Sequence, residues 1–228
     1  MRLGTLRWIQ RLFLLVILAA LAMGGWFAYQ SAQAGQGPEF LQVLIGVRPL
    51  DDTRVGIVAG HSGNDSGAVC PDGLTEAKVN MAVAQAVVLR LESRGVTADL
   101  LEEFDDLLDG YRADAFVSIH ADSCEVDFSG FKVASLEGGS DASEQLAVCL
   151  WDRYEAATGL ARHPSTITYD MTKYHAFREI APSTPAAIIE IGFLRNDREL
   201  LTQETERVAQ GIVEGVECFI NPEQEPAK

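Results

Sequence analysis

The sequence predicts an α/β domain built on a twisted, mostly parallel mixed sheet with helices on both faces, preceded by an N-terminal transmembrane or signal helix. Short apolar segments alternate with segments of helical periodicity, which is the pattern of such a domain. Several of these short segments are apolar throughout, as expected for parallel strands covered on both faces. A long uncharged run near the start of the chain predicts the additional helix.

The N-terminal segment 1–34 has the features of an export signal or an anchor. Its uncharged run, Leu12–Tyr29, would cover about 27 Å of a hydrocarbon core of roughly 30 Å as a helix. Arg2, Arg7 and Arg11 precede the run, so we expect the N-terminus in the cytoplasm and the remainder outside it. The sequence leaves open whether the segment stays as an anchor of the cytoplasmic membrane or is cleaved after Ala34, where Ala-Gln-Ala resembles a signal-peptidase site.

Five strands are expected after a linker. Residues 35–54 are rich in glycine, proline and polar residues, and contain one apolar patch that predicts an edge strand at most. The strands predicted beyond the linker are VGIVA (55–59), VTADLL (96–101), AFVSI (115–119), FKVAS (131–135) and AAIIEI (186–191). The domain is expected to span 55–220, followed by a flexible tail at 221–228.

Helices are expected between these strands. One carries Val79, Val83, Val87 and Leu91 on a single face and stops near Gly95. A second has Leu146, Leu150 and Tyr154 on one face and ends at Gly159. The last is expected as one helix that starts with a capping box, Asn196-Asp197-Arg198-Glu199, and buries Leu201, Val208, Ile212 and Val216.

The charge balance argues against nucleic acid as a partner. The chain has 18 Lys and Arg against 33 Asp and Glu, a formal net charge of −15, and three of the arginines precede the apolar run. Such a surface repels phosphate backbones. Four cysteines in an oxidising compartment can form two disulfides, and the absence of any C-x-x-C spacing argues against a cysteine zinc site.

Two histidines follow predicted strands, His61 after the first and His120 after the third. The carboxyl ends of parallel strands share one edge of a sheet, so both side chains can converge there. Glu76, at the start of the first predicted helix, can add a carboxylate, although an acid at that place also complements the helix dipole. Two imidazoles and one carboxylate leave the fourth position of zinc open, which is the arrangement of a catalytic Zn²⁺ site.

Glu190 is an ionisable residue inside the apolar strand segment IIEIGF. A buried carboxylate costs several kcal/mol unless it is paired or functional. At the same sheet edge it could take a proton from an attacking water and pass it to a leaving amine. The alternative is a structural acid paired with Arg178 or Arg195.

Four segments in this order and spacing resemble the zinc-dependent N-acetylmuramoyl-L-alanine amidases of the amidase type 3 family: VAGHSGNDSGAV, GLTEAKVN, AFVSIHAD and PAAIIEIGFLRN. The resemblance covers roughly residues 55–219. It implies zinc held by His61, Glu76 and His120, a catalytic Glu190, and hydrolysis of the amide between muramic acid and L-alanine of the stem peptide. The substrate implied is peptidoglycan or its muropeptides.

Substrate contacts are predicted more loosely. Arg178 matches an arginine ahead of the family's last strand and suits a peptide carboxylate; His175 and Asp122 are further candidates. Two other functions stay open, a non-catalytic peptidoglycan-binding module of the same fold and a zinc peptidase acting on other peptides. The protein is expected to be a monomer.

The cysteines give one specific prediction. Cys70 and Cys124 each lie a few residues beyond a candidate histidine ligand, so their loops should meet at the same sheet edge and form a disulfide. Cys149 and Cys218, on two predicted helices, are equally compatible with a bridge and with free buried thiols.

Overall fold

The computed structural model describes residues 53–222. The predicted signal or anchor segment, nearly all of the linker and most of the tail lie outside these residues. Within the described part of the chain, no helix is long and apolar enough to span a bilayer.

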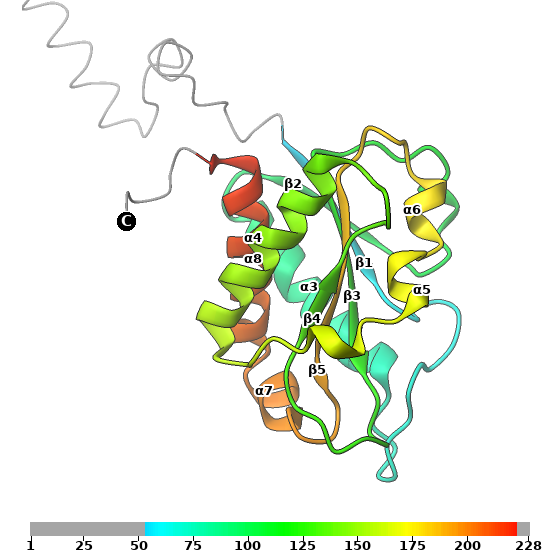
Figure 1. The fold of residues 1–228 in the computed structure, drawn as a ribbon, viewed down its shortest axis with the longest axis vertical. Coiled ribbons are helices and arrows are strands. Elements are labelled where there is room, and N and C mark those ends of the chain that lie inside the picture. Colours follow the sequence, from blue (N-terminus) through cyan, green and yellow to red (C-terminus); the bar gives the residue numbers. More distant parts are fainter. Residues whose placement is uncertain (1–52, 223–228) are drawn as a thin grey trace, which may run out of the picture. The chain divides into compact units, whose positions relative to one another are not determined.

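A five-stranded sheet in the order β2-β1-β3-β5-β4 forms the centre of the domain (Figure 1). Its strands are β1 (Arg54–Ala59), β2 (Thr97–Leu101), β3 (Ala115–Asp122), β4 (Lys132–Ala134) and β5 (Ala186–Phe193). Four of them are parallel, and β4 alone runs antiparallel, against β5. The predicted α/β class and the five strands are therefore confirmed, with β3 and β5 longer than expected.

The register of the central strands determines which residues meet at the carboxyl edge. In the β3–β5 pair His120 is opposite Glu190, and in the β4–β5 pair Lys132 is opposite the same glutamate. Residues that are opposite each other in a ladder project from the same face of the sheet. The strands thus bring His120, Glu190 and Lys132 to one face near this edge.

Three long helices cover one face of the sheet. They are α3 (Glu76–Glu92), α4 (Asp141–Thr158) and α8 (Thr205–Ile220), and their apolar stripes are buried against alternate strand residues such as Ile57, Val117 and Ile189. Figure 1 shows α4 and α8 side by side, and a disulfide between Cys149 and Cys218 joins them. The bridge, rather than two free thiols, is what the structure has at these positions. As predicted, Gly159 ends α4 in a left-handed conformation.

The other face of the sheet has a thinner cover than the sequence predicted. Instead of long helices it carries the short turns η2 (Asp106–Leu108), η3 (Pro164–Thr166), α5 (Tyr169–Thr172) and α6 (Ala176–Glu179). Buried side chains from three of these, including Leu108, Met171 and Phe177, form a second apolar cluster with Phe116 of β3. The segments on this side, residues 102–114 and 159–185, contain glycine, proline and other turn-forming residues, which disfavour a long helix there.

The single last helix expected from the sequence is instead two helices, α7 (Arg198–Gln203) and α8, separated at Glu204. The capping box predicted from Asn196 to Glu199 is also wrong, because α7 starts one residue later than this box requires: Asp197 precedes the helix, and its side chain makes no capping hydrogen bond. Its carboxylate accepts hydrogen bonds from the backbone of Gly130 and Phe193 and from the Ser129 hydroxyl. Asp197 therefore ties the end of β5 to the loop before β4.

Candidate metal centre

Three residues from three elements converge at the carboxyl edge of the sheet. His61 lies just after β1, Glu76 is the first residue of α3, and His120 lies within β3. His61 has φ of 66°, and it is the single non-glycine residue with positive φ between residues 53 and 222. That conformation is strained for a residue with a Cβ and persists where the surroundings determine it, commonly at functional sites. We call His61, Glu76 and His120 the metal group.

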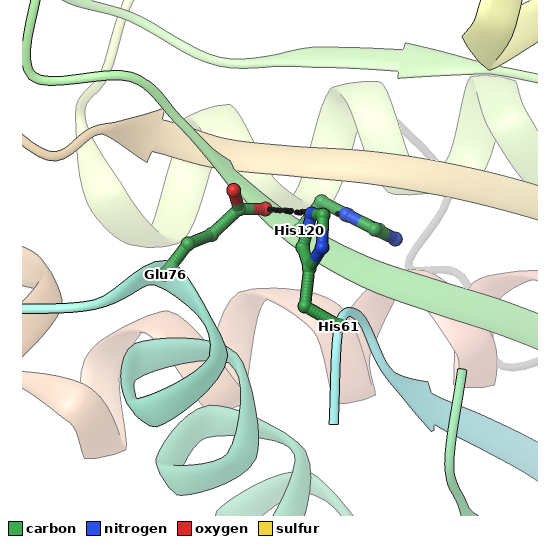
Figure 2. Close-up of side chains that lie close together, drawn as sticks. All are labelled: His61, Glu76 and His120. Atoms are coloured by element: carbon green, nitrogen blue, oxygen red, sulfur yellow. Dashed lines mark hydrogen bonds and ion pairs between the residues drawn. The ribbon is translucent and has the colours of Figure 1, made fainter. Parts of the chain in front are cut away.

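The side chains of the metal group face one another (Figure 2). One nitrogen from each histidine and one Glu76 oxygen all lie within 4.8 Å of one another. Oε1 of Glu76 is 3.2 Å from Nε2 of His61 and 3.2 Å from Nδ1 of His120. The two imidazole rings lie edge to face with centroids 5.0 Å apart. The three residues that the sequence selected as ligands are thus brought together.

Backbone and amide donors hold Glu76 in place. Its Oε1 accepts hydrogen bonds from the backbone of Ala121 and from the Asn80 side chain, and its Oε2 accepts one from the backbone of Ala68. Asn80, which is fully buried one turn along α3, also donates to the carbonyl of Gly60. The carboxylate is therefore fixed by the loop after β1 and by β3, which carry the two histidines, as well as by its own helix.

The side chains of the metal group occupy space that is open only because Gly60 and Gly67 have no Cβ. A Cβ added to Gly60 would lie 2.4 Å from Nε2 of His120. A Cβ added to Gly67 would lie 2.6 Å from a Glu76 oxygen and 2.7 Å from the His61 ring, and Gly67 also has a φ of +58°. No real Cβ makes contacts this short, so a side chain at either position would displace the metal group.

The three side chains of the metal group shift one another's pKa values toward their charged forms. Burial acts to lower the pKa of His120, but its contacts with Glu103 and Glu76 raise that pKa to about 10. The contact with Glu76 likewise raises the pKa of His61. Burial acts to raise the pKa of Glu76, yet the two histidines hold it well below its usual range. In the absence of metal the contacts within the group therefore favour the charged forms of both histidines and of the Glu76 carboxylate.

The donor set fits a zinc ion. Two imidazole nitrogens and one carboxylate oxygen are typical zinc ligands, and three protein ligands leave a position for substrate or water. His61 and His120 are close enough to a shared centre to exchange their protons for a metal. The set contains no thiolate, and it has fewer oxygen donors than calcium requires.

Glu190 lies beside the metal group, and its surroundings differ from those of Glu76. The side chain is half-buried, and its Oε2 is sealed from solvent without a hydrogen-bond partner. Among the described residues it forms no ion pair with Arg178, Arg195 or any other cation, so the structural pairing that the sequence left open is absent. Burial raises the pKa of Glu190 to about 7.

The three candidate substrate residues have different surroundings. Asp122, at the end of β3, forms an ion pair with the buried Lys132. His175 has both ring nitrogens 3.0 Å from carboxylate oxygens, those of Glu103 and Glu179. Arg178 in α6 is exposed, and no ion pair of the described chain includes it. Of the three, Arg178 alone has a charged group free for a ligand.

Sequence reasoning missed two carboxylates next to the histidines. Oδ1 of Asp65 is 2.6 Å from Nδ1 of His61, and Oε2 of Glu103 is 3.4 Å from Nε2 of His120. Asp65 lies four residues after His61 in the same loop, so that local spacing could have been noticed. Glu103 follows β2 as His61 follows β1, but it stands in an acidic run that reads as solvated surface.

A disulfide joins the two loops that border the metal group. Cys70, in the loop between β1 and α3, is bonded to Cys124, two residues after β3, with Cα atoms 5.5 Å apart. Cys70 is buried and packs in the main apolar cluster. The bridge links the loop between His61 and Glu76 to the loop after His120. It was predicted because each cysteine lies a few residues beyond one of the two histidines.

Comparison with known proteins gives a consistent result. A family model described as N-acetylmuramoyl-L-alanine amidase matches residues 55–218. N-acetylmuramoyl-L-alanine amidase AmiC of Neisseria meningitidis is 26% identical over 213 residues, covering 71% of this chain and 51% of that protein, so the chain spans about half the length of this relative.

Two solved structures share the fold. The catalytic domain of CwlV, an N-acetylmuramoyl-L-alanine amidase from Bacillus (Paenibacillus) polymyxa var. colistinus, matches with a TM-score of 0.56 at 27% identity, over 74% of this chain and 98% of that one. N-acetylmuramoyl-L-alanine amidase AmiC2 of Nostoc punctiforme matches with a TM-score of 0.59 at 25% identity, over 74% and 97% of the two chains.

Proposed function

Because the chain belongs to the N-acetylmuramoyl-L-alanine amidase family, we propose that it is a zinc-dependent peptidoglycan hydrolase. The bond cleaved is the amide between the lactyl group of N-acetylmuramic acid and L-alanine of the stem peptide. One observation carries the proposal: His61, Glu76 and His120 converge at the same sheet edge as Glu190, whose buried oxygen has no partner. A set of ligands beside an unpaired carboxylate is what metal-assisted amide hydrolysis requires.

The residues divide into ligands and an acid/base. A zinc ion held by the metal group would polarise the amide carbonyl and make an attacking water more acidic. Glu190 would accept the proton of that water and donate it to the departing amine of L-alanine. In the metal-free chain burial raises the pKa of Glu190 to about 7, so this carboxylate takes up a proton more readily than an ordinary glutamate. Asn80 and the backbone of Ala68 and Ala121 would hold Glu76 in position throughout.

The substrate would reach this edge from outside the cytoplasm. Peptidoglycan lies there, and the two disulfides of the domain suit an oxidising compartment. The exposed guanidinium of Arg178 is the proposed contact for a stem-peptide carboxylate. Asp122 and His175 stay weaker candidates because their charged groups already have partners. Attachment to the cytoplasmic membrane through segment 12–29 remains a proposal from the sequence.

Product analysis tests the reaction directly. The full chain is incubated with purified muropeptides, and mass spectrometry is used to look for intact stem peptide and for glycan with a free lactyl carboxyl group. We expect both products with zinc present, none after removal of the metal by a chelator, and recovery when zinc is added back.

The same experiment separates the alternatives. Cleavage within the stem peptide, with the lactyl amide intact, would identify a zinc peptidase instead. Retention of muropeptides on the protein without any cleavage would identify a binding module. Absence of both binding and cleavage by zinc-loaded protein would contradict the proposal.

A further inference from the structure

Glu103 is a buried carboxylate outside the metal group that contacts both histidines of the group. It follows β2 and is 6% exposed. Its Oε2 accepts a hydrogen bond from the backbone N–H of His61 at 2.8 Å and lies 3.4 Å from Nε2 of His120. Its Oε1 accepts a hydrogen bond from the Tyr174 hydroxyl at 2.9 Å and lies 3.0 Å from Nε2 of His175.

Three of these four contacts are hydrogen bonds, and the fourth, with Nε2 of His120, is an ion-pair contact. An ionised carboxylate has about four lone-pair sites, so each oxygen of Glu103 has two polar neighbours for its two sites. Burial acts to raise its pKa, but the contacts with His120 and His175 hold that pKa well below its usual range. Burying a charged carboxylate costs free energy, which its polar partners must offset. Here these partners come from two separate parts of the chain.

The His120 ring lies between two carboxylates. Its Nδ1 is 3.2 Å from Oε1 of Glu76, within the metal group, and its Nε2 faces Glu103. Nε2 is sealed from solvent and has no hydrogen-bond partner, so the ion pair with Glu103 is its polar contact in the described chain. A histidine that binds metal through one nitrogen usually donates its other N–H to a carboxylate, which fixes the tautomer and the ring orientation.

We propose that Glu103 is a positioning residue for the metal centre: it holds the Nε2–H tautomer of His120, so that Nδ1 is the nitrogen presented to zinc. A rotation of the ring that points Nε2–H at Oε2 of Glu103, now 3.4 Å away, would make this contact a charge-assisted hydrogen bond. This inference rests on the proposed zinc site, since it assigns a role toward that ion.

Tyr174 and His175 in turn hold Glu103. The Tyr174 hydroxyl also accepts a hydrogen bond from Ser118 on β3, so the network begins and ends on the strand of His120. The His175 ring stacks on Phe104, the residue after Glu103, with centroids 4.3 Å apart. Tyr174 and His175, in the segment after η3, therefore hold the Oε1 of Glu103, while its Oε2 faces the histidines of the metal group.

The test compares zinc affinity in two matched variants, Glu103→Gln and Glu102→Gln, by competition with a chromophoric chelator. Glu103→Gln keeps the shape of the side chain but removes its charge, and we expect about 10- to 100-fold weaker zinc binding. Glu102 is the exposed neighbour on the same loop, so Glu102→Gln should bind zinc as the unmodified chain does. Melting temperatures of the zinc-free proteins are measured in parallel, because a purely structural role would lower only these.

A cobalt spectrum separates positioning from direct ligation. We expect the visible bands of Co²⁺-loaded Glu103→Gln at unchanged wavelengths, because the three ligands are the same. Shifted bands would make Glu103 itself a ligand and would overturn the positioning role. Unchanged zinc affinity in folded Glu103→Gln would overturn it as well.

Tyr174→Phe gives a second, milder test if Glu103→Gln does not fold. It keeps the aromatic packing and removes one donor to Glu103, so a smaller loss of zinc affinity is expected, and unchanged affinity contradicts the inference. If the unmodified chain binds no zinc at all, the proposed function fails together with this inference. If it binds zinc and cleaves muropeptides while Glu103→Gln binds zinc equally well, the inference fails alone.

Discussion

Carboxylates on the two sides of the metal group have opposite surroundings. Glu76, at the start of α3, and Glu103, after β2, each contact a histidine side chain and accept a hydrogen bond from backbone N–H. Both carboxylates have pKa values below the usual range. On the side of β5, the Oε2 of Glu190 has no partner, and burial raises its pKa to about 7.

This difference separates two tasks that the same side chain can perform. A carboxylate that must hold a metal or orient a ligand is fixed by hydrogen bonds and stays ionised. A carboxylate that must accept and release a proton needs a pKa near the working pH, which an unpaired and partly buried position provides. Variants of Glu76 or Glu103 should therefore lose zinc affinity, whereas variants of Glu190 should keep zinc and lose turnover.

The largest loss of bound zinc is expected when a residue of the metal group is replaced. His61→Ala, Glu76→Ala and His120→Ala should each reduce bound zinc from about one ion per chain to a small fraction of it, because two ligands rarely hold zinc in competition with water. Elemental analysis of the purified variants measures this. Full zinc occupancy in Glu76→Ala would remove that residue from the ligands and leave it as an acid at a helix N-terminus.

The two disulfides differ in where they lie: Cys70–Cys124 borders the metal group, and Cys149–Cys218 joins two helices. Replacing either pair by serine opens a loop of similar size, with sequence separations of 54 and 69, and should lower the free energy of unfolding by up to about 4 kcal/mol in the chain-entropy model. Only loss of the Cys70–Cys124 bridge should also weaken zinc binding, because this bridge joins the loops of the metal group. Urea unfolding and chelator competition on both double variants measure the two effects. Equal zinc affinity in the two would show that the bridge does not support the site.

A smaller effect of opposite sign is expected from Glu190→Gln in zinc-free protein. The pKa of Glu190 is about 7 in the folded chain against 4.5 for an ordinary glutamate, so its contribution to stability is retained below pH 4.5 and lost as the pH rises to 7. At pH 8 the glutamine variant should therefore be more stable than the unmodified chain by up to about 3 kcal/mol, at about 1.4 kcal/mol per pKa unit.

The pH dependence provides the check on that expectation. Urea unfolding at pH 4.5 should show little difference between the two proteins, whereas at pH 8 the glutamine variant should be the more stable one. Glu125→Gln, at an exposed position, serves as the control and should change stability little at either pH. A Glu190→Gln protein that is less stable at pH 8 would mean that the carboxylate makes a stabilising contact.

The sequence was sufficient for the strand order along the chain and for the metal group, and the reason is topological. Parallel strands place their carboxyl ends at one edge, so His61 and His120 could be expected to converge without knowing any long-range contact. Glu190 was recognisable because an acid inside an apolar strand is anomalous. Each of these inferences depends on the local pattern of a strand and on the general geometry of parallel sheets.

What the sequence could not provide depends on contacts between distant segments. Glu103 receives donors from residues 71 and 72 positions away, and nothing in its own acidic run indicates them. A capping box was expected to begin at Asn196, but Asp197 precedes the helix instead, and its carboxylate reaches a loop 67 residues earlier. The thin cover over the second sheet face was also not predicted, because the spacing of apolar residues alone does not distinguish a short helical turn from a longer helix.

Glu190→Gln, with zinc content, melting temperature and muropeptide turnover measured on one preparation, tests the division of tasks most directly. Glutamine keeps the shape of the side chain but cannot accept a proton at neutral pH. We expect a folded protein with about one zinc per chain and a turnover lower by roughly 10² to 10⁴, the usual contribution of a positioned acid/base. Near-normal turnover by a folded, zinc-loaded Glu190→Gln protein would contradict the account.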